Sequence, residues 1–232
     1  MLIILPPSET KAPGGTGEPL SSSGLTGLSF PELNPVRSAI MDVLEHEVID
    51  APHAEVNAEL TTSPTMPAIF RYTGVVYDSL DAATLPTECW ANVAIGSALF
   101  GVSMAGDLIP IYRYSATTKL AGLNNATPKK LWGATLATAL DTVPEELILD
   151  LRSGAYQQLG PIKRAITMRV VTASGRVVNH WNKKSKGILT RILCESGEVA
   201  GLTRIEDVLE IARSAGVDVA YDSGLITVIT SG

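Results

Sequence analysis

Polar and basic side chains follow three apolar segments of this chain, near the points where buried strands are expected to end. They are Ser8, Glu9, Lys11, Ser97, Arg113, Ser153 and Tyr156. The carboxyl ends of strands are the usual place for a site in an α/β protein. We therefore expect these side chains to line one pocket, if the strand ends converge.

The residue types in this pocket favour anion binding and acid–base chemistry. Arg113 is expected to bind an anion bidentately, and Tyr156 to stack on a base or donate a hydrogen bond. If the protein is an enzyme, Ser8, Glu9 and Tyr156 are the candidate catalytic residues. Glu9 or Asp150 would act as a general base if the pKa of its carboxyl were raised. For Asp150 we favour the simpler interpretation that it satisfies a turn.

A second group of candidates lies in the stretch HWNKKSKGILTR, residues 180–191, which holds five basic side chains and no acid. The whole chain has a net charge of −6, and residues 1–110 alone carry −10. By contrast, residues 152–191 contain nine Lys or Arg and no Asp or Glu. Such asymmetry indicates a polyanionic partner. The alternative is that these cations are scattered over a solvated surface and paired with acids from elsewhere.

Asn182 is predicted to be the N-cap of a helix that runs to about residue 194. Its first turn would contain Lys183, Lys184 and Lys186. The helix dipole disfavours cations there by roughly 0.3–1 kcal/mol each. A bound anion, most naturally a phosphate, would relieve the conflict. Arg191 would extend this patch, and Gly187 would let a backbone or a ligand approach closely.

The elements expected to position these residues alternate between strands and helices. The sequence predicts strands at residues 2–5, 90–95, 147–151, 165–172, 176–181, 217–221 and 225–230, the last four as two hairpins. It predicts helices at residues 36–48, 53–60, 128–140, 182–194 and 203–214, with Thr203 and Glu206 forming a capping box. Residues 12–35 are predicted to be a long Gly/Pro/Ser-rich loop. The expected fold class is α/β (α+β): one domain over residues 1–232, with a mixed sheet flanked by helices.

Composition excludes several classes of protein. With 45% hydrophobic and 18% charged residues, the chain has a globular rather than a disordered composition. It has no apolar run near the roughly 18 residues of a membrane span, and its N-terminus lacks the positive region of a signal peptide. Cys89 and Cys194 are expected to be reduced thiols, and the three histidines have no metal-ligand spacing. We expect no membrane partner, metal or cofactor.

Six segments of the chain, in order, resemble the YaaA family of peroxide-stress proteins. They are PPSETK, YTGVVYDSL, IGSALFGVSMAGDLIPIYR, LWG, LRSGAY and NKKSKGILTRIL. The resemblance runs from Met1 to about Leu193 and is weaker in the tail. One such segment would be a weak signal, whereas six in order are specific. Many members have a lysine where this chain has Glu9, and here Lys11 follows two positions later.

The resemblance implies a cytoplasmic protein that supports survival of peroxide stress and control of unincorporated iron. Family members are also linked to binding of duplex and distorted DNA, through a positively charged cleft in a single-domain fold with a helix-hairpin-helix element. The phosphate or DNA contacts would then come from Lys11, Ser97, Arg113, Ser153, Lys183, Lys184, Lys186 and Arg191.

Two hypotheses from different classes stay open at this point. The first is a DNA-binding stress protein without catalysis. The second is an enzyme acting on a nucleoside, nucleotide or flipped base, for example by cleaving an N-glycosidic bond. Such an enzyme needs a pocket beside a phosphate-binding surface, and its partner would be a phosphate-bearing small molecule or DNA. A third hypothesis, direct iron sequestration, is disfavoured by the scarcity of His and Cys.

Overall fold

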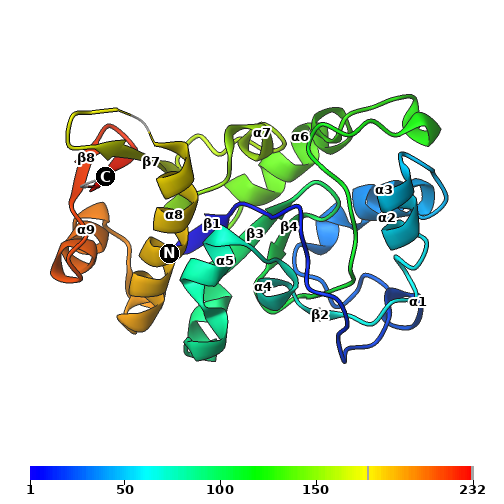
Figure 1. The fold of residues 1–232 in the computed structure, drawn as a ribbon, viewed down its shortest axis with the longest axis horizontal. Coiled ribbons are helices and arrows are strands. Elements are labelled where there is room, and N and C mark those ends of the chain that lie inside the picture. The colour runs from blue at the N-terminus through cyan, green and yellow to red at the C-terminus, as the bar shows by residue number, and fades with distance from the viewer. Residues whose placement is uncertain (177, 231–232) are drawn as a thin grey trace.

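A computed structural model describes residues 1–176 and 178–230, in which helices flank one main sheet (Figure 1). Within these residues the main sheet has seven strands in the order β4-β3-β1-β6-β7-β9-β8. The strands are β1 Leu2–Leu5, β3 Val93–Ser97, β4 Gly101–Met104, β6 Ile148–Asp150, β7 Ile166–Thr172, β8 Val219–Asp222 and β9 Leu225–Thr230. A separate small sheet pairs β2, Met66–Pro67, with β5, Leu108–Ile109. The predicted fold class is confirmed.

The five inner strands of the sheet, β3, β1, β6, β7 and β9, run parallel to one another. The two edge strands, β4 and β8, are antiparallel to their neighbours. The sequence LIIL of β1 is buried throughout, as expected for a strand at the centre of a parallel sheet covered on both faces. From β1 the sheet grows to β3 on one side and to β6 on the other. The strand order therefore reverses direction at β1. In open α/β sheets, ligands bind outside the carboxyl ends of the strands at a point where the order reverses.

The α-helices in the described residues vary in length from four to seventeen residues. They are α1 Leu20–Ser23, α2 Asn34–Leu44, α3 Ala51–Asn57, α4 Ala68–Arg71, α5 Val75–Leu80, α6 Pro128–Asp141, α7 Gly154–Gln157, α8 Asn179–Glu195 and α9 Ile205–Ser214. Short 3-10 helices lie at Pro31–Leu33, Ala82–Thr84, Thr87–Asn92, Ala121–Leu123 and Val199–Gly201. The stretch predicted as a long loop, residues 12–35, thus contains α1, one 3-10 turn and the first residues of α2.

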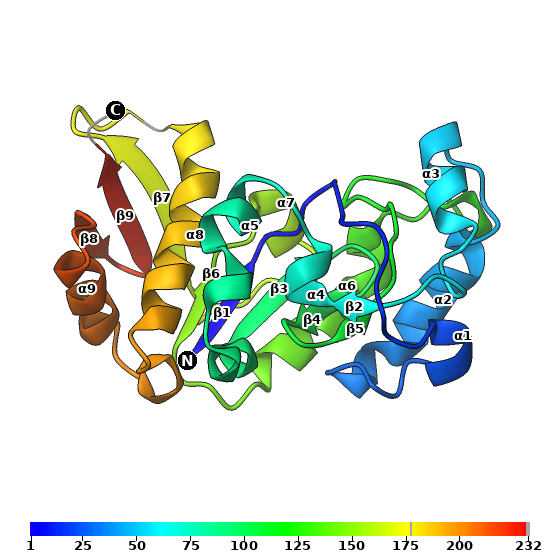
Figure 2. The same ribbon diagram turned by 60° about the horizontal axis from the view of Figure 1, so that its bottom comes forward.

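Helices α8 and α5 lie side by side in both views of the ribbon (Figures 1 and 2). Gly187 of α8 makes this approach possible. A Cβ atom at Gly187 would lie 2.2 Å from the carbonyl oxygen of Val76 and 2.9 Å from the Cβ of Ser79. The close approach expected at Gly187 is therefore made by the backbone of α5, and any larger residue would push the two helices apart.

Local predictions are wrong at the starts of α8 and α9. The stretch 176–181 was expected to be a strand, but it is helical from Asn179 onward; Val177 lies outside the described residues. The capping box is also absent, because α9 begins at Ile205 with Arg204 as its N-cap. The Glu206 carboxylate instead lies 3.5 Å from the Arg204 guanidinium.

The early start of α8 changes the electrostatic argument made for its lysines. The backbone N–H of Asn182 donates to the carbonyl of Val178 at 3.1 Å, so Asn182 is inside the helix rather than its N-cap. The lysines therefore begin in the second turn, whereas the dipole effect falls off within the first. The predicted conflict between the dipole and these charges is absent, and any role in anion binding must come from their position beside a cleft.

Candidate functional site

A cleft of about 590 Å³ opens where β1 and β6 end, and we call it the main cleft. Its wall includes the turn after β1, the start of α5, α7 and the lysine face of α8. The predicted site residues in it are Ser8, Glu9, Ser153, Tyr156, Lys183 and Lys186. The structure thus brings the N-terminal turn and the lysine helix into one cleft.

A smaller cavity of about 150 Å³, which we call the Lys11 cavity, adjoins the main cleft. The two share wall residues, Ser8, Glu9, Ser115 and Tyr156. The Lys11 cavity adds three side chains that can carry positive charge, Lys11, His53 and Arg113. The candidate residues that follow β1 and β6, together with Arg113 after β5, therefore line two adjoining hollows.

The turn after β1 is fixed by the segment that leads into α5. The backbone N–H of Thr73 donates to Ser8 Oγ at 3.1 Å, and Thr73 Oγ1 donates to Thr10 Oγ1 at 2.9 Å. The Tyr77 hydroxyl donates to the Pro6 carbonyl at 2.8 Å. Ser8 Oγ also donates to the carbonyl of Thr10. Ser8 therefore anchors the turn, and a nucleophilic role for it would require these bonds to break.

Lys11 lies against aromatic rings in the smaller cavity. Its Nζ is 4.1 Å from the centroid of the Tyr112 ring and 5.3 Å from that of Tyr72. It donates to the carbonyls of Ser8 at 3.1 Å and Glu9 at 3.4 Å. Burial, and after it the nearby Arg113 charge, lower the pKa of Lys11 against the opposing effect of Glu9, and the net result is a pKa of about 7. Lys11 is therefore a cation that can lose its proton near neutral pH.

Arg113 is exposed at the same cavity, and its backbone is clamped by a buried asparagine. Asn57 Nδ2 donates to the Arg113 carbonyl at 2.9 Å, and the Arg113 N–H donates to Asn57 Oδ1 at 2.8 Å. One turn earlier in α3, His53 Nδ1 lies 2.7 Å from Asp50 Oδ1, and this bond lowers the pKa of the Asp50 carboxyl. Asn57 and His53 could not be predicted as site residues, because a single residue within a short helix has no spacing signal.

Ser97 lies beneath the cavity walls rather than in them. It is fully buried at the end of β3, and its Oγ accepts from the N–H of Phe100 at 2.9 Å and bonds to the Tyr112 hydroxyl at 2.7 Å. Tyr112 in turn bonds to the Tyr72 hydroxyl at 2.7 Å. The contact between Ser97 and a phosphate expected from the sequence is thus corrected: Ser97 holds the ring against which Lys11 rests.

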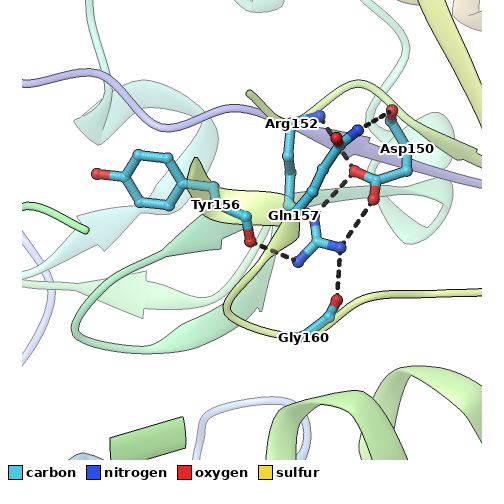
Figure 3. A network of polar contacts seen from close by, with 5 residues as sticks. All are labelled: Asp150, Arg152, Tyr156, Gln157 and Gly160. Carbon is cyan, nitrogen blue, oxygen red and sulfur yellow. Dashed lines mark hydrogen bonds and ion pairs between the residues drawn. The ribbon is translucent and has the colours of Figure 1, made fainter. Parts of the chain in front are cut away.

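A buried ion pair at the end of β6 contacts α7 through the Tyr156 carbonyl (Figure 3). Arg152 Nε and Nη2 lie 2.8 Å from Asp150 Oδ1 and Oδ2, and Nη2 also donates to the Gly160 carbonyl at 2.8 Å. Gly96 leaves the room for this side chain, because a Cβ there would lie 2.6 Å from Arg152 Cδ. Both carboxylate oxygens of Asp150 are occupied, which supports the structural interpretation over that of a general base.

Ser153, the N-cap residue of α7, and Tyr156 within α7 line the main cleft. Figure 3 shows the Tyr156 ring pointing away from the ion pair, while its carbonyl accepts from Arg152 Nη1 at 3.3 Å. Burial, and to a lesser degree the nearby Glu9, raise the pKa of the Tyr156 hydroxyl. The phenol therefore keeps its proton at neutral pH and can donate a hydrogen bond to a ligand.

The lysines of α8 differ in exposure. Lys183 and Lys184 are exposed, with Lys184 Nζ 5.2 Å from the Trp181 ring, whereas Lys186 is only 7% exposed. Burial lowers the pKa of Lys186, and the Asp150 carboxylate partly offsets that effect. Lys183 and Lys186 line the main cleft, and Lys184 lies next to them in sequence on the same helix.

Arg191 is directed elsewhere, away from the lysines it was expected to extend. Its guanidinium donates to the Leu80 carbonyl and to Thr84 Oγ1, both at 2.9 Å, and pairs with Glu195 at 2.6 Å. These partners hold α8 against the end of α5. The contact between Arg191 and a phosphate in the cleft, expected from sequence, is not part of this arrangement.

The Lys11 cavity holds one group of cations and the main cleft holds the lysines of α8, and hydroxyl side chains line the walls between them. This combination suits a phosphate ester whose remaining part is polar. Among the residues that the structure describes, no three His, Cys, Asp or Glu side chains gather closely enough to hold a metal ion. Over the same part of the chain, no helix is both long and apolar enough to cross a membrane.

The fold and the cleft define a class: a single-domain α/β protein with a mixed seven-stranded sheet and a lysine-lined cleft at the strand ends. The family described as peroxide stress protein YaaA matches residues 1–214. A UPF0246 protein of Corynebacterium efficiens is 48% identical over 242 residues, covering 97% of this chain and 96% of the relative. A UPF0246 protein of Streptomyces coelicolor is 37% identical, covering 85% and 84%. An uncharacterized protein of Campylobacter jejuni is 30% identical, covering 83% and 84%.

The chain therefore belongs to the peroxide stress protein YaaA family. The family resemblance that six sequence segments indicated is confirmed. The description of the family associates it with peroxide stress.

Proposed function

We propose that the protein acts in the cytoplasm by binding duplex or distorted DNA through the lysine-bearing wall of the main cleft. In this proposal, protection against oxidative damage from unincorporated iron follows from DNA binding. The observation that carries it is the convergence of Lys183 and Lys186 with Ser8, Ser153 and Tyr156 in one cleft. Lysines beside hydroxyl groups are suited to the phosphates of a nucleic acid backbone.

Only some of the basic residues between 152 and 191 are free to bind a phosphate, because others are paired with acids. Arg152 is bound by Asp150, and Arg191 by Glu195. The exposed side chains of Lys183 and Lys184 stand beside the cleft, where a phosphate can displace their counterions. DNA binding is thus assigned to a few lysines of α8, and not to the whole run of basic residues between 152 and 191.

The size of the cleft favours distorted DNA over a uniform duplex. A volume of about 590 Å³ lies in the range of small-molecule sites and cannot accept a double helix. A duplex would lie along the lysines of α8, and one unstacked nucleotide would enter the cleft toward Tyr156. Bulged or mismatched DNA, which loses less energy on unstacking, should therefore bind more tightly than a perfect duplex.

One observation favours the alternative, an enzyme acting on a nucleoside, nucleotide or flipped base. Ser8, Arg113 and Tyr156 line the same small cavity beside the main cleft. Glu9 is in that cavity too, so the candidate catalytic residues and an anion-binding arginine are in reach of one ligand. In this alternative the lysines of α8 hold the phosphate of a small molecule instead of a DNA backbone.

The test is a charge reversal with a matched control. Lys183→Glu with Lys184→Glu should abolish duplex binding without unfolding the protein. Lys129→Glu with Lys130→Glu makes the same charge change at two adjacent exposed lysines of α6 outside both cavities, and should bind like wild type. Fluorescence anisotropy with perfect and bulged duplexes measures binding, and circular dichroism confirms the fold.

The salt dependence separates the two candidate functions. Each phosphate contact contributes about −0.9 to the slope of log affinity against log salt, so wild-type protein that holds DNA through both lysines should show a slope of about −1.8 or steeper. Duplex binding by the Lys183→Glu, Lys184→Glu variant at wild-type affinity would show that the DNA proposal is wrong. A flat salt response in wild type would favour the small-molecule alternative.

A further inference from the structure

Lys11 differs from the lysines of α8 in what surrounds its amine. Its side chain packs against the rings of Tyr72 and Tyr112, whereas Lys183 and Lys184 are exposed. The carbonyls of Ser8 and Glu9 accept hydrogen bonds from its Nζ. A neutral amine has two N–H donors and one lone pair, so these two carbonyls satisfy both donors. The cavity of about 150 Å³ that Lys11 lines provides space for a ligand.

The charges around Lys11 work against its protonated form. Burial has the largest effect, and Arg113 and then Arg71 add repulsion, which together outweigh the attraction of Glu9 and bring the pKa of Lys11 to about 7. The titratable and charged groups that face the amine from the surrounding elements are Glu9, His53, Arg71, Tyr72, Tyr112, Arg113, Tyr114 and Tyr156. At pH 7 the neutral fraction of such an amine is roughly a thousandfold that of an ordinary lysine.

We propose that the Lys11 amine is a nucleophile that condenses with the aldehyde group of a phosphate-bearing ligand held in the cleft. The inference deepens the proposed function and rests on it for the phosphate site, which Arg113 and the lysines of α8 provide. Two sources share this chemistry: a free phosphorylated aldose, and the ring-opened deoxyribose at an abasic position in DNA.

The proposed reaction forms an imine and releases one water. The lone pair of the neutral Nζ forms a bond to the carbonyl carbon, and the C=O π electrons move to the oxygen, which takes a proton. The nitrogen loses a proton to solvent or to the Glu9 carboxylate. The hydroxyl then takes a second proton from solvent, the C–O bond breaks with departure of water, and the nitrogen lone pair completes the C=N bond of an iminium ion, which gives the neutral imine when the nitrogen returns its remaining proton to solvent. No oxidant or reductant takes part, because the condensation changes no net oxidation state.

Reductive trapping tests the inference. Wild-type protein is incubated with sodium cyanoborohydride and either D-glyceraldehyde 3-phosphate or a duplex with one abasic site, and the adduct is located by peptide mass spectrometry. We expect the adduct at Lys11. Lys11→Arg should lower adduct formation by about tenfold or more, since a guanidinium stays protonated at pH 7. The matched control Lys130→Arg, at an exposed lysine of α6, should form as much adduct as wild type.

The pH dependence of adduct formation is a second test, and it can be measured on wild-type protein alone. Adduct formation at Lys11 in wild-type protein should rise through pH 7 and level off above it, while labelling of surface lysines keeps rising toward pH 10. Because the peptide map locates the adduct in wild type, the inference stays testable even if Lys11→Arg loses its fold. Adducts spread over many lysines, with no excess at Lys11, would overturn it.

The result also separates this inference from the proposed function. Duplex binding without trapping of either probe at Lys11 would show that the inference is wrong and leave the DNA proposal intact. Trapping of D-glyceraldehyde 3-phosphate at Lys11 by a protein that binds no DNA would support the inference and overturn the DNA proposal. Trapping of the abasic duplex alone would identify DNA as the source of the aldehyde.

Discussion

The two ends of helix α8 border two hollows of opposite charge. Toward the N-terminal end, Lys183 and Lys186 line the main cleft of about 590 Å³. At the C-terminal end, a more open hollow of about 960 Å³ lies against α9 and is lined by carboxylates. These belong to Glu195, Glu198, Asp207 and Glu210. Volume alone would select the acidic hollow, whereas the arrangement of polar side chains selects the other.

The difference lies in what brings the side chains together. The main cleft collects residues from the ends of β1 and β6, where sheet topology forces distant segments to meet. The acidic hollow lies between the ends of α8 and α9, and Glu195 is already engaged by Arg191 one turn earlier. A cation or a carboxylate on α8 is therefore available to a ligand only where its own neighbours have not neutralised it.

Breaking the buried ion pair at the end of β6 should have the largest effect. Asp150→Ala removes a carboxylate that is buried with Arg152 and leaves the guanidinium unpaired. We expect a loss of about 3–5 kcal/mol in the free energy of unfolding. Glu195→Ala, which breaks the partly exposed pair at the other end of α8, should cost about 0.2–1 kcal/mol. Urea denaturation measures both, and equal losses would remove the distinction between the two regions.

The Lys11 cavity should make stability depend on pH. The folded pKa of Lys11 is about 7, below its unfolded value, so the unfolded chain binds more protons above pH 7. The penalty for burying the charge is complete below pH 7 and fades as the pH rises to about 10.4. Wild type should therefore gain stability relative to Lys11→Met over this window. Since Lys11 retains some solvent contact, we expect less change than at Asp150.

The control for this measurement is Lys130→Met, which removes an exposed lysine from α6. Its unfolding free energy should follow that of wild type at each pH between 7 and 10. If Lys11→Met also runs parallel to wild type, the Lys11 amine is not held at a disadvantage by the fold. That outcome would mean that the fold does not disfavour the charge of Lys11 more than that of the exposed Lys130. It would remove the electrostatic support for imine formation at Lys11.

Strands and helices of strong local pattern could be predicted from the sequence. The LIIL strand, the helix that begins at Pro128 and the hairpin of β8 and β9 follow from apolar runs, a Thr-Pro start and a short Gly-containing turn. The start of α8 could not, because RVVN has β-forming residues, yet α8 begins at Asn179 and packs against α5 at Gly187. The local β propensity of these residues did not decide their conformation.

The candidate site was predictable where residues follow strand ends. Ser8, Glu9, Ser153 and Tyr156 meet because parallel strands place their carboxyl ends along one edge of the sheet. Side-chain direction was not predictable: Ser97 also ends a strand, yet its hydroxyl turns inward to Tyr112. The clamp of Asn57 on the Arg113 backbone joins segments 56 residues apart, and only the fold reveals it.

Charge reversal at the acidic hollow should have a small effect on DNA binding. Eleven residues separate Lys184 from Glu195, about 16 Å along the helix axis, which exceeds the Debye length of about 8 Å at physiological salt. Glu198→Lys with Glu210→Lys should therefore change duplex affinity by less than about threefold, since exposed charges at that range are screened. Anisotropy titrations at physiological salt measure this. A gain as large as the loss in the Lys183→Glu, Lys184→Glu variant would mean that DNA responds to total charge and not to one cleft.

The smallest response is expected from the thiols near the acidic end of α8. Cys194 of α8 and Cys89 are 1% and 3% exposed, their thiols contact each other, and burial raises the pKa of both. Peroxide attacks the thiolate form, so native protein should keep both thiols reduced under conditions that oxidise them after unfolding. Mass spectrometry after alkylation counts the free thiols. Rapid joining of Cys89 to Cys194 in folded protein would place the peroxide-sensitive element at the acidic end of α8, and the cleft would then be only one of two functional ends.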